Sequence, residues 1–392
     1  MRGVLIILIV LTFLKTTKSF INHPFNKEPN KTKSWSDCFL KEVNGYGYNW
    51  PEKATISGEI LLMGVNKRLF NKMTKAHKPR LGSMQFWPRK RARHSVARIR
   101  SWAESKKAKP QAFIGYKVGM THLLVVDNRP KSITKGDKIA SPVTIIECPP
   151  LMVMGVAFYK NSLLGMKKTV SILAGNLDKA LSKTIQLPKK TIKKIEEVKE
   201  FDDLKILVYS NPKQTSNGSK KPKLLEIAVG GSNDEKFAFA KENLGKAIKI
   251  SDVFEIGNSI DVHGISKGKG FQGTVKRFGA PIRQHKSEKT KRGIGNLGAW
   301  TPKRVDFRVP QSGKMGFHLR TEHNKQIIEI SNDVEKIMPA GGLRNYGNIK
   351  NDYLLLKGSV VGPKRRVVVI TESIRPNSKI TKEAPAIAHI HK

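Results

Sequence analysis

The charge of this chain limits what it can fold into. Seventy-three lysines and arginines face 31 aspartates and glutamates in 392 residues, which gives a formal net charge of +42. Such an excess repels itself in a compact chain unless a polyanion neutralises it. Hydrophobic residues nevertheless make up 39% of the chain, enough for a sizeable core in one large or two ordinary domains. The composition favours a folded body with basic segments for a nucleic acid over a soluble protein with solvated lysine faces.

Cysteines and histidines give no sign of a metal or redox site. Cys38 and Cys148 lie far apart and form no CxxC pair, so neither a zinc knuckle nor a disulfide framework is indicated, and a reducing compartment is expected. The histidines nearest to a cluster lack cysteines or regularly spaced carboxylates beside them; they are His263, His285, His318 and His323. We expect no metal and no cofactor, and the C-terminal HIHK is typical of a frayed end.

The first 62 residues differ from the rest. An apolar run from Val4 to Leu14 is typical of a weak secretory signal and is short for a transmembrane helix. Exporting a polycation with two unpaired cysteines makes little sense, and the composition turns abruptly basic at Met63. We therefore expect residues 1–62 to be a leader outside the native protein, which would start at Met63. A weak signal peptide is the alternative.

The stretch Met63–Pro110 holds 15 lysines and arginines and one acid, Glu104. Phe86, Trp87 and Trp102 stand among these charges without apolar periodicity. Alone, such a stretch buries too little apolar surface to offset its ordering entropy, so we expect disorder, with its aromatic rings packed on a partner. Arginine forks and aromatic faces suit phosphates and unstacked bases. We interpret residues 63–110 as a nucleic-acid-binding extension; a solvated tail or localisation signal is the alternative.

Order is predicted from residue 111 onward. Runs rich in β-branched and aromatic residues at 111–128 and 141–159 predict strands of a barrel or sandwich. Between about 175 and 250 the pattern mixes helix, polar loop and strand, which indicates an α/β insertion with a helix in EKFAFAKENLGKAI. Strands resume within 250–265, and the run at 351–374 is expected to close the sheet.

Residues 266–315 interrupt the strands with glycine, lysine and arginine. In KRGIGNLGAWTPKR, Trp300 has glycines before it and no apolar neighbours that could build a core. The ring is therefore expected to stack on nucleic-acid bases. Gly268–Gly273 match the dinucleotide pattern GxGxxG, but TVKRFGAP after them is not expected to form a helix, so no pyrophosphate site is indicated. These glycines more plausibly let the backbone approach a polyanion.

Sequence motifs of common enzymes are missing. The chain contains no GxSxG, HExxH or GxxxxGK[ST], and few carboxylates accompany its basic segments. A nuclease or RNA-modifying enzyme is the runner-up from another functional class, but magnesium-assisted chemistry needs acidic ligands that these segments lack.

Five blocks, in matching order and with matching separations, resemble the large-subunit ribosomal protein L3 (uL3) family in its archaeal and eukaryotic form. They are MGVNKR…RLGSMQFWPRKRARHSVARIRSW, ISKGKGFQGTVKRFG, IGNLGAWTPKRV, SGKMGFHLRTEHNK and YGNIKNDYLLLKGSVVGPKRR. The resemblance covers Met63 to about Pro376. Phe278 and Phe317 stand where the family commonly has tryptophan and tyrosine. His285 is the nearest match to a histidine that is methylated in eukaryotic relatives, although KTKRG here departs from their KTHRG.

The resemblance implies a mainly β fold with an α/β insertion: a six-stranded translation-protein-type β-barrel carrying two long basic extensions. Residues 63–110 would be the first extension, and 266–315 would be a central loop that reaches toward the peptidyl-transferase centre. The barrel would comprise 111–265, with the insertion at about 175–250, and 316–376, followed by a basic tail at 377–392.

The residues expected to bind rRNA are cationic or aromatic side chains of these extensions and their surroundings. They are Lys67, Arg68, Arg80, Phe86, Trp87, Arg89, Lys90, Arg91, Arg93, Arg98, Arg100, Lys267, Lys269, Lys276, Arg277, His285, Lys291, Arg292, Trp300, Lys303, Arg304 and Arg320. Close backbone approach is expected at Gly268, Gly270, Gly273, Gly293, Gly295 and Gly298.

The implied function is that of a non-enzymatic structural constituent of the large ribosomal subunit, located in the cytoplasm. It would bind rRNA, support subunit assembly and shape the surroundings of the peptidyl-transferase centre. Its partners would be rRNA and neighbouring ribosomal proteins, without a membrane, a small-molecule substrate or a homo-oligomer. An extraribosomal RNA-binding or RNA-processing protein is the alternative.

Overall fold

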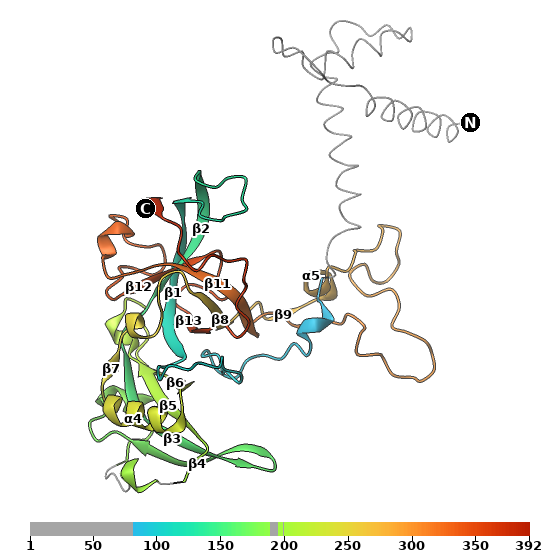
Figure 1. Cartoon of the computed structure of the whole chain (residues 1–392). Coiled ribbons are helices and arrows are strands. Elements are labelled where there is room, and N and C mark those ends of the chain that lie inside the picture. Colours follow the sequence, from blue (N-terminus) through green and yellow to red (C-terminus); the bar gives the residue numbers. More distant parts are fainter. Residues whose placement is uncertain (1–80, 189–194, 199) are drawn as a thin grey trace, which may run out of the picture. The chain divides into compact units, whose positions relative to one another are not determined.

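The computed structural model describes residues 81–188, 195–198 and 200–392 (Figure 1). They belong to one compact unit, Arg80–Lys392. The predicted leader at 1–62 and the basic residues 63–80 lie outside the described residues. Within the described ranges, no helix is long and apolar enough to cross a membrane.

Six strands form a closed ring, with antiparallel pairing between every pair of neighbours (Figure 1). In order around the ring they are β1 (Ala112–Val126), β2 (Lys138–Glu147), β12 (Tyr353–Lys357), β11 (Leu319–Ser331), β8 (Ser259–Ile265) and β13 (Val367–Glu372). The ring closes where β13 pairs with β1, with Ala112 opposite Thr371. A seventh strand, β14 (Ile387–Ile390), pairs with the distal part of β1.

The strands β12 and β13 are apolar along most of their length, and their consecutive buried residues show that both of their faces are covered. Tyr116, Ile145, Leu355 and Val369 are fully buried, although they come from four different strands. Burying one such aliphatic side chain contributes about 1.5 to 3 kcal/mol. The predicted strand runs at 111–128 and 351–374 are therefore confirmed, and they supply β1, β12 and β13.

A second sheet carries the region in which the sequence indicated an insertion. Its strand order is β4 (Gly165–Leu173), β3 (Leu151–Ser162), β5 (Asp203–Ser210) and β6 (Lys223–Ala228), and β7 (Ala247–Ile248) also pairs with β3. The predicted helix is confirmed as α4 (Asn233–Asn243), which begins with a capping box between Ser232 and Glu235. Lys236 of α4 forms an ion pair with Asp203 of β5 at 3.0 Å.

The predicted run at 141–159 divides between the two sheets. Its first part lies in β2 of the ring and its second part forms β3, so the second sheet begins at Leu151, earlier than the insertion boundary of about 175. Pro149 and Pro150 separate the two strands. Neither proline has an N–H to donate to a sheet ladder, so the chain leaves the ring here.

Short 3₁₀-helices occupy several connections. They are η2 (Met84–Phe86), η3 (Lys179–Lys183), η4 (Ile195–Glu197), η5 (Pro212–Gln214), η6 (Ile250–Asp252) and η7 (Val334–Lys336). Only part of the predicted run at 250–265 is therefore a strand, namely β8.

A buried carboxylate fixes one loop to the ring. Glu147 at the end of β2 is fully buried. It accepts hydrogen bonds from the Tyr346 hydroxyl, from the backbone N–H groups of Lys350 (3.0 Å) and Asn351 (3.2 Å), and from the Asn351 amide (2.8 Å). Both carboxylate oxygens thus have partners within the protein, which a buried charge requires.

Of the four histidines noted in the sequence, His263 and His323 lie near Asp261 in the ring, and His285 lies away from them. His263 is buried between the hydroxyls of Thr321 (2.9 Å) and Thr371 (3.0 Å), and burial lowers its pKa. His323 donates from Nδ1 to Asp261 at 2.8 Å, whereas His285 is exposed in the central loop. In the described part of the chain, no group of three or more His, Cys, Asp or Glu side chains is placed to hold a metal ion.

The expectation of a frayed C-terminus is wrong. In β14, Ile390 pairs with Leu123 of β1. The His391 ring stacks on His122 with centroids 4.3 Å apart, and the Thr121 hydroxyl donates to the His391 carbonyl at 2.6 Å. The long β1 strand offers an unpaired edge beyond β13, and the last residues of the chain fill it.

Candidate nucleic-acid interface

Two basic segments outside the sheets pack on each other. We call residues 81–110 the arm and residues 266–315 the central loop. The Ala92 N–H donates to the Phe317 carbonyl at 2.9 Å, directly after the central loop. His318 Nδ1 donates to the Lys90 carbonyl at 2.8 Å while its Nε2 accepts from the Gly316 N–H at 3.1 Å. The middle of the arm is therefore hydrogen-bonded to the residues that directly follow the central loop.

Trp87 joins the arm to the central loop. Its ring meets Phe278 and Phe307 edge-on, at centroid distances of 6.1 and 6.2 Å. The Trp87 Nε1–H donates to the Gly82 carbonyl at 3.3 Å, and Gly82 itself has a φ of 76°. A Cβ on Gly82 would lie 2.3 Å from the Phe278 ring, so only glycine fits beneath this contact. We call Trp87, Phe278 and Phe307 the aromatic joint.

A short helix in the central loop corrects the sequence reading. TVKRFGAP was not expected to be helical, yet α5 (Thr274–Phe278) forms one turn, which ends at Gly279 with a φ of 67°. Glycine supplies this left-handed C-terminal residue without steric cost. A dinucleotide site is still not indicated, because the strand before α5, β9 (Phe271–Gln272), pairs antiparallel with β10 (Gly313–Lys314) and forms no βαβ unit.

Arginines crowd around the aromatic joint. The Arg89 guanidinium lies 4.5 Å from the centre of the Phe278 ring, and Arg277 approaches the same ring at 5.0 Å. Burial, followed by repulsion from Arg277 and Arg320, lowers the pKa of Arg89. Burial also lowers the pKa of Arg277 and Arg320, though arginine stays protonated. Within the described ranges, none of these three arginines forms an ion pair with a carboxylate.

Backbone carbonyls and aromatic faces are the partners that these arginines do have. Arg277 donates to the carbonyls of Gln311 (2.8 Å) and Lys314 (3.1 Å), which ties α5 to the returning strand of the loop. Arg320 lies 5.0 Å from the centre of the Phe86 ring. Neither kind of partner neutralises a full positive charge, so the cluster can still attract an anion.

The tip of the central loop points its aromatic residue outward. Trp300 is 83% exposed and Leu297 is 52% exposed. The tip folds on local turns: the Gly298 N–H donates to the Asn296 side chain at 2.8 Å, and the Lys303 N–H donates to the Trp300 carbonyl at 2.8 Å. Gly298, with a φ of 118° and open space around its Cα, permits this turn. Trp300 is therefore not a core residue of the protein itself.

The structure divides the predicted site residues into three groups. Trp87, Arg89, Arg277 and Arg320 are half-buried in or beside the aromatic joint. The exposed residues are Phe86, Lys90, Arg91, Arg93, Arg98, Arg100, Lys267, Lys269, Lys276, His285, Lys291, Arg292, Trp300, Lys303 and Arg304. Lys67, Arg68 and Arg80 lie outside the described residues. Of the six glycines, Gly268, Gly273 and Gly295 are exposed as well, Gly293 is half-buried, and Gly270 and Gly298 have positive φ.

Part of the arm packs on protein instead of remaining free. Ala97 is buried, and Val96, Ile99 and Trp102 pack against the main core. The expectation that all aromatic rings of the basic stretch pack on a partner is therefore wrong for Trp102, and it is wrong for Trp87, whose ring contacts Phe278 and Phe307. Val96, Ile99 and Trp102 recur at every third residue, a spacing that the surrounding basic residues hid from the sequence interpretation.

Sequence reasoning missed Phe307 and Arg366. Phe307 completes the aromatic joint, and the Arg366 guanidinium lies 5.0 Å from the centre of the Phe317 ring, which Arg91 approaches at 5.6 Å. Burial lowers the pKa of Arg366. The basic run PKRR before β13 was the available signal for Arg366, whereas nothing local distinguishes Phe307.

Comparison with known proteins places these features in a family. A family profile described as ribosomal protein L3 matches residues 72–390. The chain is 44% identical over 329 residues to the large ribosomal subunit protein uL3 of Methanobrevibacter smithii, covering 81% of this chain and 98% of the relative. It is 43% identical over 323 residues to uL3 of Methanocaldococcus jannaschii, covering 80% and 96%. Identity to uL3 of Methanococcus vannielii is 45% over 310 residues, covering 77% and 93%.

Proposed function

Because the chain belongs to the ribosomal protein L3 family, as five blocks of its sequence predicted, we propose that it is a structural component of the large ribosomal subunit. The family is not enzymatic. In this role the protein binds rRNA and neighbouring ribosomal proteins, supports subunit assembly and works in the cytoplasm as part of the ribosome. An extraribosomal RNA-binding role is the alternative.

The fold and its divisions are part of the proposal. The closed antiparallel ring of six strands supports a β-barrel of the translation-protein type, with the second sheet from Leu151 onward as its insertion. The proposed extensions are residues 63–110 and the central loop, 316–376 complete the barrel, and 377–392 form a basic tail that adds β14 to β1.

The observation that carries the proposal is the charge of the central loop. Residues 266–315 contain 13 lysines and arginines and two acids, Glu288 and Asp306. Asp306 already forms an ion pair with Arg308 at 2.9 Å. A loop with this excess and an exposed Trp300 at its tip suits rRNA, because phosphates neutralise its cations and bases offer faces on which the ring can stack.

The aromatic joint supports a combined role for the arm and the central loop. Trp87 and Phe278 connect the two segments through a contact within the protein, so both would enter rRNA as one preassembled body. In this proposal the exposed cations make phosphate contacts, and the tip around Trp300 lies near the peptidyl-transferase centre and shapes its surroundings.

Sedimentation tests the proposed function. The native protein should sediment with large ribosomal subunits and remain there after a moderate salt wash, because dozens of phosphate contacts would have to break together. A protein that leaves the subunits in this wash, while other large-subunit proteins stay, is an extraribosomal or loosely bound polycation.

A further inference from the structure

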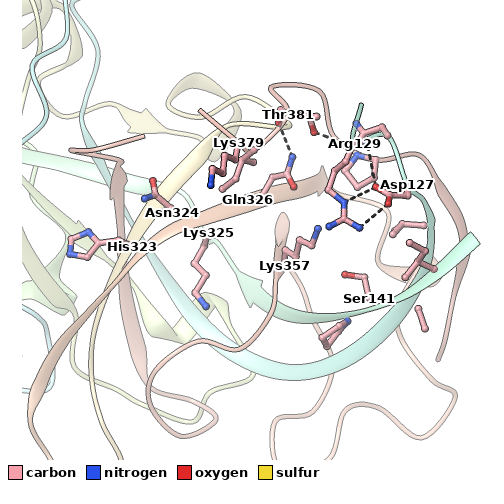
Figure 2. A pocket seen from close by; sticks show the side chains of 17 residues that line it. Asp127, Arg129, Ser141, His323, Asn324, Lys325, Gln326, Lys357, Lys379 and Thr381 are labelled. Carbon is pink, nitrogen blue, oxygen red and sulfur yellow. Dashed lines mark hydrogen bonds and ion pairs between the residues drawn. The ribbon is translucent and has the colours of Figure 1, made fainter. Parts of the chain in front are cut away.

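A pocket lies at the end of the ring opposite the central loop. Its volume is about 590 Å³, and it is walled by the end of β1, the start of β2, the middle of β11, the end of β12 and residues of the segment 379–385 (Figure 2). The register of β11 on β8 fixes the two ends: Leu319 pairs with Ile265, next to the central loop, whereas Gln326 pairs with Ser259 at the pocket. The pocket is therefore separate from the interface proposed above.

The lining of the pocket has an excess of positive charge. Arg129, Lys325, Lys357 and Lys379 line it, and the one acidic residue among the lining residues is Asp127. The Asp127 carboxylate is already occupied, because it accepts from Arg129 Nε and Nη2, both at 2.8 Å, and from the Thr134 hydroxyl at 2.8 Å.

Two of the pocket lysines have no carboxylate partner among the described residues. Lys325 forms an ion pair with Glu322 at 3.2 Å, but across the described ranges Lys357 and Lys379 form none. Both are exposed, one at the end of β12 and the other in the C-terminal segment. Figure 2 shows Lys357 extending toward Arg129, so positive groups from strand β12 and from the loop after β1 face one space.

The pocket is held open by its own hydrogen bonds. Gln326 Nε2 donates to the Thr381 carbonyl at 3.0 Å, and Asn128 Nδ2 donates to the Glu383 carbonyl at 3.0 Å. These bonds fix the C-terminal segment across the strand ends. The Ser141 hydroxyl, on β2, is buried in the wall and adds a neutral donor (Figure 2).

We propose that this pocket binds a phosphate group, from an RNA backbone or from a free phosphate or nucleotide. Lysine ammonium groups act as point charges that suit a phosphate. The one guanidinium group in the pocket, that of Arg129, already binds Asp127 through two hydrogen bonds, so it is not available to bind the carboxylate of a ligand in the same way. Among the lining residues there is no phenylalanine, tyrosine or tryptophan, and the one imidazole, His323, is bonded to Asp261 at 2.8 Å. We therefore expect the pocket to contact the phosphate and not to stack on a base. Only the RNA source rests on the proposed ribosomal function.

Lysine footprinting tests the proposal. The full chain, purified free and within native large subunits, is treated with acetic anhydride, and acetylation of each lysine is quantified by mass spectrometry. Lys357 and Lys379 should react in the free protein and become protected by about tenfold where a phosphate engages them. Exposed Lys167 and Lys179 in the second sheet region are the internal references.

The arms of the experiment separate the sources. Protection in subunits that disappears after ribonuclease digestion assigns the site to RNA. Protection of the free protein by millimolar inorganic phosphate assigns it to a free phosphate. The proposal is overturned if Lys357 and Lys379 react like the reference lysines in every arm. It is also overturned if protection in subunits survives ribonuclease and phosphate has no effect on the free protein, because another protein then covers the pocket.

Variants check that the two lysines act through the pocket. Phosphate should raise the thermal midpoint of the free protein, and Lys357→Gln with Lys379→Gln should abolish most of that rise. Lys167→Gln with Lys179→Gln removes the same charge elsewhere and should preserve it. An equal loss in both pairs contradicts a specific site. If the protein proves absent from large subunits, the proposed function fails, whereas the phosphate arm still decides the pocket.

Discussion

Charged side chains find different partners in the ring and in the two basic segments, the arm and the central loop. In the ring, buried Asp261 accepts from His323 Nδ1 (2.8 Å) and from the Asn324 N–H (2.9 Å), and buried Glu147 is equally well provided for. In the central loop, Trp300 is exposed and the arginines at the aromatic joint lack carboxylates. The difference teaches that the buried carboxylates Asp261 and Glu147 of the ring have their partners within the protein, whereas the loop has the chemistry of one half of an interface.

The largest expected effect comes from removing a buried hydrogen-bond acceptor from the ring. Glu147→Ala leaves the Tyr346 hydroxyl and two backbone N–H groups without their acceptor, so we expect a loss of about 3 to 5 kcal/mol in the free energy of unfolding. Urea unfolding of the free protein measures it. Glu200→Ala is the control, because the exposed pair that Glu200 forms with Lys160 should contribute under about 1 kcal/mol. Equal effects would contradict the special status of Glu147.

Trp300→Ala should show the reverse behaviour. Losing one base–aromatic stack should weaken RNA binding by about 1 to 3 kcal/mol, while unfolding of the free protein changes little. Binding to an rRNA fragment and urea unfolding are compared for the same variant, and mutant subunits are assayed for peptidyl transfer. Destabilisation of the free protein by several kcal/mol would mean that the ring of Trp300 packs inside the protein.

A third prediction tests whether exposed lysines of the central loop contact the phosphates of RNA. Lys267→Gln with Lys269→Gln should lower the log–log salt slope of RNA binding by about 1.4 to 1.8, since each exposed lysine contributes about 0.7 to 0.9. Filter binding over a range of salt concentrations gives the slope. Arg277→Gln should behave differently, because Arg277 also holds the carbonyls of Gln311 and Lys314. An unchanged slope for the lysine pair would remove both lysines from the interface.

Removing the aromatic joint should loosen the arm without unfolding the ring. Trp87→Ala removes two edge-on ring contacts. Each contact stabilises the folded protein by about 0.5 to 1.5 kcal/mol, in addition to the contribution from burying the ring surface. Hydrogen exchange in residues 81–93 should accelerate, while exchange in β13 stays slow. Trp87→Phe, which retains a ring, is the conservative control. Unchanged exchange in the arm would show that the backbone bond from Ala92 to Phe317 suffices to hold it.

The smallest effect concerns pH. Burial lowers the pKa of His263, so the unfolded chain takes up this proton at a higher pH than the ring does. The ring should therefore lose stability as the pH falls below about 6.5, by under about 1 kcal/mol from this group. The midpoint of urea unfolding, compared at pH 7 and pH 5, measures the loss of stability. The imidazole protons of His263, followed by NMR, should titrate below pH 6.5. Titration at or above that value would reverse the sign.

Local patterns predicted the elements, but not how they are assembled. The apolar runs of β12 and β13 and the helical spacing of apolar residues in EKFAFAKENLGKAI, which became α4, are visible in sequence because each depends on neighbouring residues. Ring closure is not visible, since it pairs Ala112 with Thr371 at the far end of the chain. The helical turn of α5 was missed because Gly279, rather than apolar periodicity, defines it.

The same distinction holds for the candidate site. The exposure of Trp300 followed from its glycine-rich surroundings, which offer no core. The inward placement of Trp87 did not follow, because its partners Phe278 and Phe307 are remote in sequence. Charge alone could not separate Arg277, which binds carbonyls of its own loop, from exposed Lys267 and Lys269.

The pairing of β1 with β13 also constrains how this protein folds during its synthesis. β1 is among the first ring strands to be translated and β13 is the last, so a nascent chain halted before Val367 leaves β1 and β8 each with an open edge. Contacts this distant in sequence form late, and open edges invite pairing with other chains. The cationic arm and central loop are synthesised before the ring can close. During synthesis the chain therefore passes through a stage in which the cationic arm and central loop exist before the ring has closed. We expect a chaperone that covers the cationic segments and the open strand edges to be most useful at this stage.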